Sequence, residues 1–188
     1  MIYYLSLGSN LGDRARNLKK AIEELKEHVV IEALSSLYDT EPWGYREQGK
    51  FLNMVVKVKS QLAPSEVLRA TKEVETRIGG KKKKRRRWGE RMIDIDIVLA
   101  FDDGREITIK TDELTIPHPN IEKRNFVLIP LKEIENNVRI KNVRIKDRNI
   151  DYWIDKNGEQ KVKKVHALVI QQSCHCGDYM EFVQKKVS

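Results

Sequence analysis

The chain has 188 residues, 40% of them hydrophobic, which is enough for one main folded domain and too few for two ordinary ones. No stretch approaches the roughly 20 apolar residues that cross a bilayer, and the N-terminal residues MIYYLSLGSN lack the pattern of a secretory signal, so we expect a cytoplasmic protein without a membrane partner. Of the net charge of +8, seven charges come from the run Lys81–Arg87, so the basicity is local and indicates one place that meets an anion.

The first part of the chain predicts a strand followed by a helix. Residues 1–7 are rich in β-branched and aromatic side chains and run into turn formers at 8–10. Asp13 can cap the helix that comes next. Residues 14–28 favour an amphipathic helix, because apolar side chains recur there at helical spacing, namely Leu18, Ala21, Ile22 and Leu25.

Two strands and a long loop should follow. Residues 29–40 and 51–60 are rich in strand-forming side chains. Between them, residues 40–50 combine turn formers with aromatic side chains, which indicates an irregular loop. We expect this loop to expose Trp43 and Tyr45.

The next segment predicts a helix, a strand and a hairpin. Pro64 can occupy the first position of the helix, and 79–80 (Gly-Gly) ends it. Its inward side chains should be Val67, Leu68, Val74 and Ile78. Residues 92–101 form the most clearly patterned strand, and Asp103-Gly104 favours a turn into 105–110.

A short helix around Arg124, ending before Pro130, completes the order β-α-β-β-α-β. This order favours an α+β, ferredoxin-like fold, with helices on one face of an antiparallel sheet. We expect a catalytic domain over 1–135 and a small C-terminal β-rich extension over 136–188, packed on or beside it.

The extension predicts mainly strands. Residues 138–146 are a short duplication that suggests two strand-like pieces, and Asn157-Gly158 suggests a hairpin returning through 162–170. Cys174 and Cys176, with His166 nearby, could bind zinc, but the C-x-C spacing is poor for a metal and four ligands are not evident. We therefore interpret these cysteines as incidental.

Two carboxylates stand out in the strand over 92–101. Because side chains alternate along a strand, Asp94 and Asp96 should share one face, opposite Ile93, Ile95, Ile97 and Leu99. Residues i and i+2 lie roughly 6.6–6.8 Å apart at the backbone, so the two carboxylates can lean onto shared cations. Without a cation their mutual repulsion would raise the pKa of one of them.

An alternative is that both aspartates simply face solvent, which is the commoner case for an isolated D-x-D. The residues just upstream favour the metal-site interpretation: Arg85, Arg86, Arg87, Trp88, Gly89 and Arg91. A cationic loop beside a carboxylate pair suits a polyphosphate bridged by metal. Oxygen ligands favour Mg²⁺.

Four co-linear motifs carry a family resemblance: SLGSNLGD, SSLYDTEPWGYREQGKFLN, RWGERMIDIDIVL and LTIPHPNIEKRNFVLIPLKEI. Together they closely resemble 6-hydroxymethyl-7,8-dihydropterin pyrophosphokinase, over roughly 1–135. The resemblance implies a ferredoxin-like core and transfer of pyrophosphate from ATP to the hydroxymethyl group of a dihydropterin, with release of AMP, in folate or related pterin biosynthesis. It also implies two Mg²⁺ ions bound with ATP, and we expect no nucleic-acid partner and a monomer that could associate through its extension.

The resemblance assigns roles residue by residue. It implies that Asp94 and Asp96 bind the metal ions and that catalysis also involves Lys82, Trp88 and Arg91. For ATP it implies contacts from Glu75, Arg87, Arg91, Ile97, Thr115, His118 and Arg124. For the pterin it implies Thr40, Pro42, Trp43, Gly44, Phe51, Asn53, Trp88, Asp94 and Phe126.

Some of these residues also allow a structural interpretation. Phe51 could equally be core packing. Asn53 lies among apolar residues and needs a polar partner, for which a ligand edge is one candidate. A methanopterin precursor would need a nearly identical pocket, so the pathway stays open.

Two departures from the family pattern affect the basic loop. After Gly80 this chain has four lysines where the family usually has an arginine, and a lysine such as Lys82 supplies charge without a bidentate fork. Glu90 replaces the usual proline, which should leave the loop more flexible.

The rival function is RNA binding, since a ferredoxin-like sheet with aromatics and a basic run suits it. Against it, the basic residues stand next to two aspartates that would repel a phosphate backbone, and no RNP-type strand motif is present.

Overall fold

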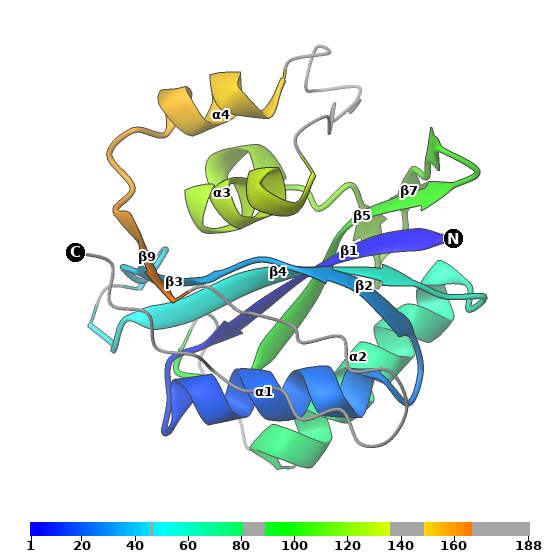
Figure 1. Ribbon diagram of the computed structural model, residues 1–188, viewed down its shortest axis with the longest axis horizontal. Helices are drawn as coiled ribbons and strands as arrows, with labels where there is room; N and C mark the ends of the chain where they lie inside the picture. Colours follow the sequence, from blue (N-terminus) through cyan, green and yellow to red (C-terminus); the bar gives the residue numbers. More distant parts are fainter. Residues whose placement is uncertain (46, 81–88, 136–148, 167–188) are drawn as a thin grey trace.

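The computed structural model describes residues 1–45, 47–80, 89–135 and 149–166. Within these ranges, seven strands form one sheet in the order β6-β5-β1-β4-β3-β9, and β2 pairs with β4 off this path (Figure 1). The strands are β1 (Ile2–Ser9), β2 (Val30–Leu34), β3 (Leu37–Thr40), β4 (Phe51–Lys59), β5 (Asp94–Asp102), β6 (Arg105–Glu106) and β9 (Val162–His166). A separate pair is formed by β7 (Ile109–Lys110) and β8 (Thr115–Ile116).

Helices cover both faces of this sheet (Figure 1). On one face, α1 (Arg14–Leu25) and α2 (Pro64–Gly79) pack on the larger hydrophobic core, and on the other lie α3 (Asn125–Ile134) and α4 (Ile150–Lys156) with a second core. The α+β sheet with helices packed on it is confirmed. The expectation that helices occupy only one face is wrong, because the apolar side of α3 needs a surface of its own to bury.

The ends of α1 and α2 follow from local chemistry. The carboxylate of Asp13 accepts the backbone N–H of Arg16 at 3.0 Å and caps α1. Pro64 occupies the first turn of α2, where its missing N–H costs nothing, and Gly80 ends the helix with φ 71°. These two helices were predicted from the sequence, although α1 ends at Leu25 rather than at residue 28.

Residues 29–40 do not form the single strand that their composition predicts. The segment divides into β2 and β3 at Ser35 and Ser36. Ser35 is bonded to Val55 through both its backbone N–H and its hydroxyl oxygen, at 2.9 Å each. Ser36 donates its N–H and its hydroxyl to Glu133 on α3, at 2.8 and 2.6 Å. Ser35 thus offers β4 its hydroxyl oxygen as the acceptor for the Val55 N–H, and Ser36 bonds to α3, so the regular ladder is interrupted at these two residues.

Pro130 does not stop the helix near Arg124, as the sequence suggested. The helix α3 runs through it to Ile134, and Pro130 is buried. Its neighbours Val127, Leu128 and Leu131 are fully buried in the second core. Burial of this apolar face outweighs the one hydrogen bond that a proline removes.

The predicted alternation along β5 holds for the aspartates and fails at Leu99. Ile95 and Ile97 lie in the core under α1 and α2, as expected. The pairing with β1 then shifts, so that Leu5 faces Ile97 while Tyr4 faces Leu99. This β-bulge turns Leu99 into the core under α3.

The extension is less β-rich than its sequence suggests. Asn157 caps the end of α4 instead of starting a hairpin, and β9 joins the main sheet antiparallel to β3. The duplication at 138–146 and both cysteines lie outside the described residues. The division of the chain at residue 135 stays a prediction. Where the structure describes the chain, no helix is both long and apolar enough to cross a bilayer.

Candidate active site

A cavity opens where β1, β4 and β5 meet the loop after β3 and the start of α3. Its lining comprises Ser6, Gly8, Thr40, Glu41, Trp43, Gln48, Phe51, Asn53, Gly89, Arg91, Asp94, Asp96, Arg124 and Phe126. One part of this lining is aromatic and amide-bearing and includes Glu41, and the other holds the carboxylates of Asp94 and Asp96 and two guanidinium groups. The cavity can therefore hold a flat heterocycle next to an anion.

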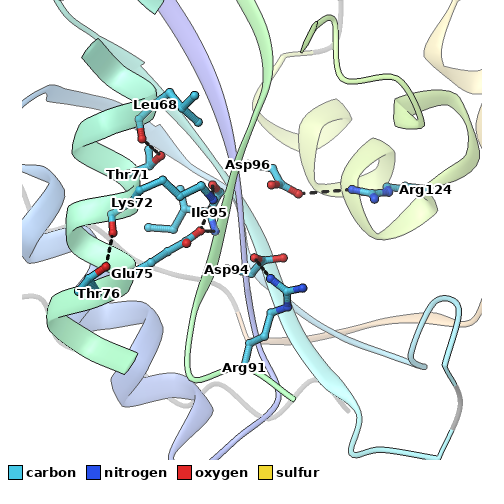
Figure 2. A network of polar contacts seen from close by, with 10 residues as sticks. All are labelled: Leu68, Thr71, Lys72, Glu75, Thr76, Arg91, Asp94, Ile95, Asp96 and Arg124. Carbon is cyan, nitrogen blue, oxygen red and sulfur yellow. Dashed lines mark hydrogen bonds and ion pairs between the residues drawn. The ribbon is translucent and has the colours of Figure 1, made fainter. Parts of the chain in front are cut away.

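Asp94 and Asp96 project from β5 on the same side of the strand, as the alternation predicts (Figure 2). Asp94 Oδ1 lies 2.7 Å from Arg91 Nη1, and Asp96 Oδ2 lies 3.5 Å from Arg124 Nη1. Burial and the neighbouring charge of Asp96 raise the pKa of Asp94, and Arg91 opposes that rise. A cation between the two carboxylates would offset the repulsion between their charges.

Glu75 does not reach the cavity; it lies behind β5 (Figure 2). Its Oε1 accepts the backbone N–H of Ile95 at 2.8 Å and the ammonium of Lys72 at 2.6 Å. Lys72 Nζ also lies 3.4 Å from the Ile95 carbonyl oxygen. Among the strands that the structure describes, β6 pairs with β5 only at Phe101 and Asp102, so at Ile95 these side chains bond the outer edge of β5 in place of a strand. The contact of Glu75 with ATP stays a prediction, and the structure shows its contacts with Ile95 of β5 and Lys72 of α2.

Arg124 is the central cation of the cavity. Its guanidinium lies 5.0 Å from the ring centroid of Trp43 and 5.6 Å from that of Phe126. The side chain is only 13% exposed, and its Nε is buried without a hydrogen-bond partner among the described residues. Burial lowers the pKa of Arg124, and the charge of Asp96 opposes that shift. A buried cation with an unused donor is well suited to an anionic ligand.

His118 lies beside Arg124, just behind the cavity lining. Its backbone N–H donates to the Val98 carbonyl at 3.0 Å, and Nδ1 accepts from the Asn120 N–H at 3.2 Å. Burial and the charge of Arg124 lower the pKa of His118 to about 4. With Nδ1 accepting, the neutral ring carries its proton on Nε2, 3.4 Å from Arg124 Nη1. Because both nitrogens are then donors, they do not bond to each other and can donate to one shared acceptor.

The aromatic part of the cavity is built around Asn53. This residue is 4% exposed, and its Nδ2 donates to Thr40 Oγ1 at 2.7 Å. A Cβ on Gly8 would lie 2.5 Å from Asn53 Oδ1, so only glycine leaves room for the amide at this position. Phe51 extends beside them from the same strand, β4, and lines the cavity instead of packing wholly in the core.

The other predicted residues are distributed as follows. Trp43 and Tyr45 are half-buried, which corrects the expectation that their loop exposes them. Pro42 and Gly44 line a second cavity, together with Trp43, Phe126 and residues 159–162 of the extension. Ile97 is 4% exposed in the larger core, and Thr115 lies on β8; neither lines the first cavity. Lys82, Arg87 and Trp88 lie outside the described residues.

Sequence reasoning missed Asn10. Its backbone N–H donates to the Arg91 carbonyl at 3.1 Å, and its Oδ1 accepts the Arg91 N–H at 2.7 Å. Its Nδ2 donates to Gln48 Oε1 at 3.0 Å. Asn10 thus joins the segment before β5 to the loop before β4. The signal was its place in the motif SLGSNLGD, where an asparagine directly follows a buried strand.

Gly8, Ser6, Glu41, Gln48 and Gly89 were also missed as lining residues. Gly8, Ser6 and Gly89 are small and carry no chemical signature of their own, and Glu41 and Gln48 are polar residues of a kind that is common in any surface loop. They are recognised only once the fold brings their backbones against the same space.

The donor set suits a hard cation held jointly with a ligand. Across the described part of the chain, no group of three or more His, Cys, Asp or Glu side chains could enclose a metal. Asp94 and Asp96 would supply two carboxylate ligands, which fits Mg²⁺, an ion that keeps waters and binds substrate phosphates.

Comparison with known proteins places these observations in a family. The family model for 7,8-dihydro-6-hydroxymethylpterin-pyrophosphokinase (HPPK) matches residues 4–136. The 2-amino-4-hydroxy-6-hydroxymethyldihydropteridine pyrophosphokinase of Aquifex aeolicus (strain VF5) is 49% identical over 135 residues, covering 72% of this chain and 81% of that protein. The Bacillus subtilis (strain 168) protein of the same name is 44% identical, covering 71% and 77%.

Among solved structures, the fold is similar to that of Plasmodium falciparum HPPK-DHPS A437G with SDX-DHP. The TM-score is 0.62 at 15% identity, covering 98% of this chain and 51% of that one. The chain thus spans about half the length of that protein, and this likeness concerns the fold alone.

Proposed function

Because the chain belongs to the 7,8-dihydro-6-hydroxymethylpterin-pyrophosphokinase family, we propose that its cavity binds a hydroxymethyl-dihydropterin beside ATP and transfers the pyrophosphoryl group between them. The hydroxyl oxygen of the pterin attacks the β-phosphorus and loses its proton to solvent, and the bond from that phosphorus to the oxygen bridging the α-phosphorus breaks. AMP leaves with that oxygen. The observation that carries the proposal is the pairing of Asp94 and Asp96 with two arginines at one end of an aromatic cavity.

The pterin belongs to the aromatic part of the cavity. Phe51 and Phe126 supply apolar ring faces, and Asn53 and Thr40 supply hydrogen-bonding edges. Asn53 already has one partner in Thr40, so its oxygen remains oriented toward the strand that carries Gly8. A fixed amide next to apolar rings discriminates by hydrogen bonding, since a ligand without the matching edge leaves buried polar groups unpaired.

The phosphates belong to the charged part. Asp94 and Asp96 would hold Mg²⁺ there, and the ion neutralises phosphate charge when bound. Arg91 and Arg124 pair with these aspartates, so a cation held by the carboxylates would free both guanidinium groups to bind phosphate oxygens. Positioning and charge neutralisation supply most of what phosphoryl-type transfer requires.

AMP formation tests the proposal. The protein is incubated with ATP, Mg²⁺ and 6-hydroxymethyl-7,8-dihydropterin, and each component is omitted in turn. We expect AMP and the pterin diphosphate in equal amounts only when all components are present. Formation of ADP, or AMP without the pterin, would contradict the reaction. A parallel incubation with a methyl-substituted pterin alcohol distinguishes the folate substrate from a methanopterin precursor.

A further inference from the structure

The extension holds the backbone that carries Arg124. Arg124 directly precedes α3, with φ −123° and ψ 87°, outside the helical region. The first N–H groups of a helix have no partner within it. One of them, the amide of Asn125, donates to Oε1 of Gln160 at 3.0 Å.

The same side chain also bonds the chain on the other side of Arg124. Gln160 Nε2 donates to the Lys123 carbonyl oxygen at 2.7 Å. The oxygen of the Gln160 amide therefore accepts from Asn125 and its nitrogen donates to Lys123, and these are the two residues that flank Arg124. This arrangement fixes the path of the backbone at the residue between them.

Asn125 and Asn157 add further bonds between the same two segments. Asn125, 2% exposed, donates through Nδ2 to the carbonyls of Ile154 and Asn157 at 3.0 and 3.1 Å. Asn157 Nδ2 donates to the Glu122 carbonyl at 2.7 Å. Figure 1 shows α4 lying over α3, with β9 leading down to the edge of the sheet beside β3. The extension is thus bonded to the segment around Arg124 at the end of α4 and paired with the main sheet through β9.

We infer that Gln160 is a positioning residue that acts on the reaction through Arg124. The inference rests on the proposed function, in which Arg124 meets the phosphates. From its present backbone position the guanidinium lies beside Asp96 and Trp43, and small displacements of a charged group that acts on a reaction cost rate steeply. Gln160 lies beyond residues 4–136, where the family model matches, so this support comes from the chain's own extension.

A double-mutant cycle tests the coupling. Gln160→Met keeps the side-chain volume and removes both hydrogen bonds, and we expect it to lower kcat/KM for ATP about ten-fold, with most of the loss in kcat. In an Arg124→Ala background the same change should have almost no further effect, because the residue it positions is gone. Lys163→Met, at an exposed position on β9, is the matched control and should leave activity unchanged. Equal losses with and without Arg124 would overturn the inference.

Amide exchange gives a readout that needs no turnover. The Asn125 N–H should be protected in the wild-type protein and in Lys163→Met, and should exchange at least ten-fold faster in Gln160→Met, with Gln160→Ala as a second variant. Unchanged exchange in both variants would overturn the inference. A wild-type protein that makes no AMP would overturn the proposed function instead, whatever the exchange shows.

Discussion

Glu75 on α2 holds the backbone of Ile95 from behind, at the residue between Asp94 and Asp96. The N–H of Ile95 donates to Glu75 Oε1 at 2.8 Å, and Glu75 is 8% exposed (Figure 2). A carboxylate on one side of β5 therefore fixes the strand from which the two cavity carboxylates project on the other side.

Replacing Glu75 should affect both stability and activity. Glu75→Leu leaves the Ile95 N–H and Lys72 without their acceptor, so we expect a loss of about 1–3 kcal/mol in the free energy of unfolding. AMP formation should also fall, since the spacing of Asp94 and Asp96 is no longer fixed. Urea unfolding and steady-state rates measure the two effects. Glu73→Leu, at an exposed position of α2, is the control, and an equal effect there would argue against this role.

We predict that Gly8 affects pterin binding because it leaves room for the amide of Asn53. Gly8→Ala places a methyl group where Asn53 Oδ1 now lies, 2.5 Å from the ideal Cβ, so the amide must move. We expect KM for the pterin to rise at least ten-fold, while KM for ATP changes little. Gly104→Asn serves as control, because nothing lies within 4 Å of its Cβ and asparagine tolerates a φ of 74°. A uniform rise in both KM values would contradict this interpretation.

The lowered pKa of His118 predicts that part of the free energy of unfolding is lost in acid. Its pKa is about 4 when folded and about 6.5 ordinarily, so the unfolded chain binds the proton more readily between these values. The contribution of His118 is therefore complete above about pH 6.5 and declines as the pH falls toward about 4. When the pH is lowered from 7 to 5, the free energy of unfolding measured in urea should fall less in His118→Gln than in the wild type. Parallel pH dependence in the two proteins would show that another group is responsible.

The sequence predicted those parts of the fold that depend on local pattern. The helix start at Pro64, the turn at Asp103-Gly104 and the shared face of Asp94 and Asp96 all follow from spacing and side-chain type. Leu99 was placed on the wrong face because a β-bulge depends on how β5 pairs with β1, which the pattern of one strand does not contain.

The sequence indicated only part of the cavity lining, for a related reason. Asp94, Arg91 and Arg124 were selected as candidates from their motifs, and the structure brings them to one cavity. The functions of Glu75, Asn10 and Gln160 lie in hydrogen bonds to backbone groups far away in the chain, at Ile95, Arg91 and Asn125. Such bonds leave no spacing pattern, and only the folded chain reveals them.

The most direct measurement is binding of Mn²⁺ in place of Mg²⁺, followed by electron paramagnetic resonance with a non-hydrolysable ATP analogue. The wild-type protein should bind the ion tightly only when the nucleotide is present, because the ion would then be held jointly by the carboxylates of Asp94 and Asp96 and by the phosphates. Asp94→Asn and Asp96→Asn should each weaken this binding by at least a factor of about 100 and abolish AMP formation, with the fold retained. Asp102→Asn, at the exposed end of the same strand, should bind like the wild type. Undiminished Mn²⁺ binding and turnover in Asp96→Asn would contradict the account.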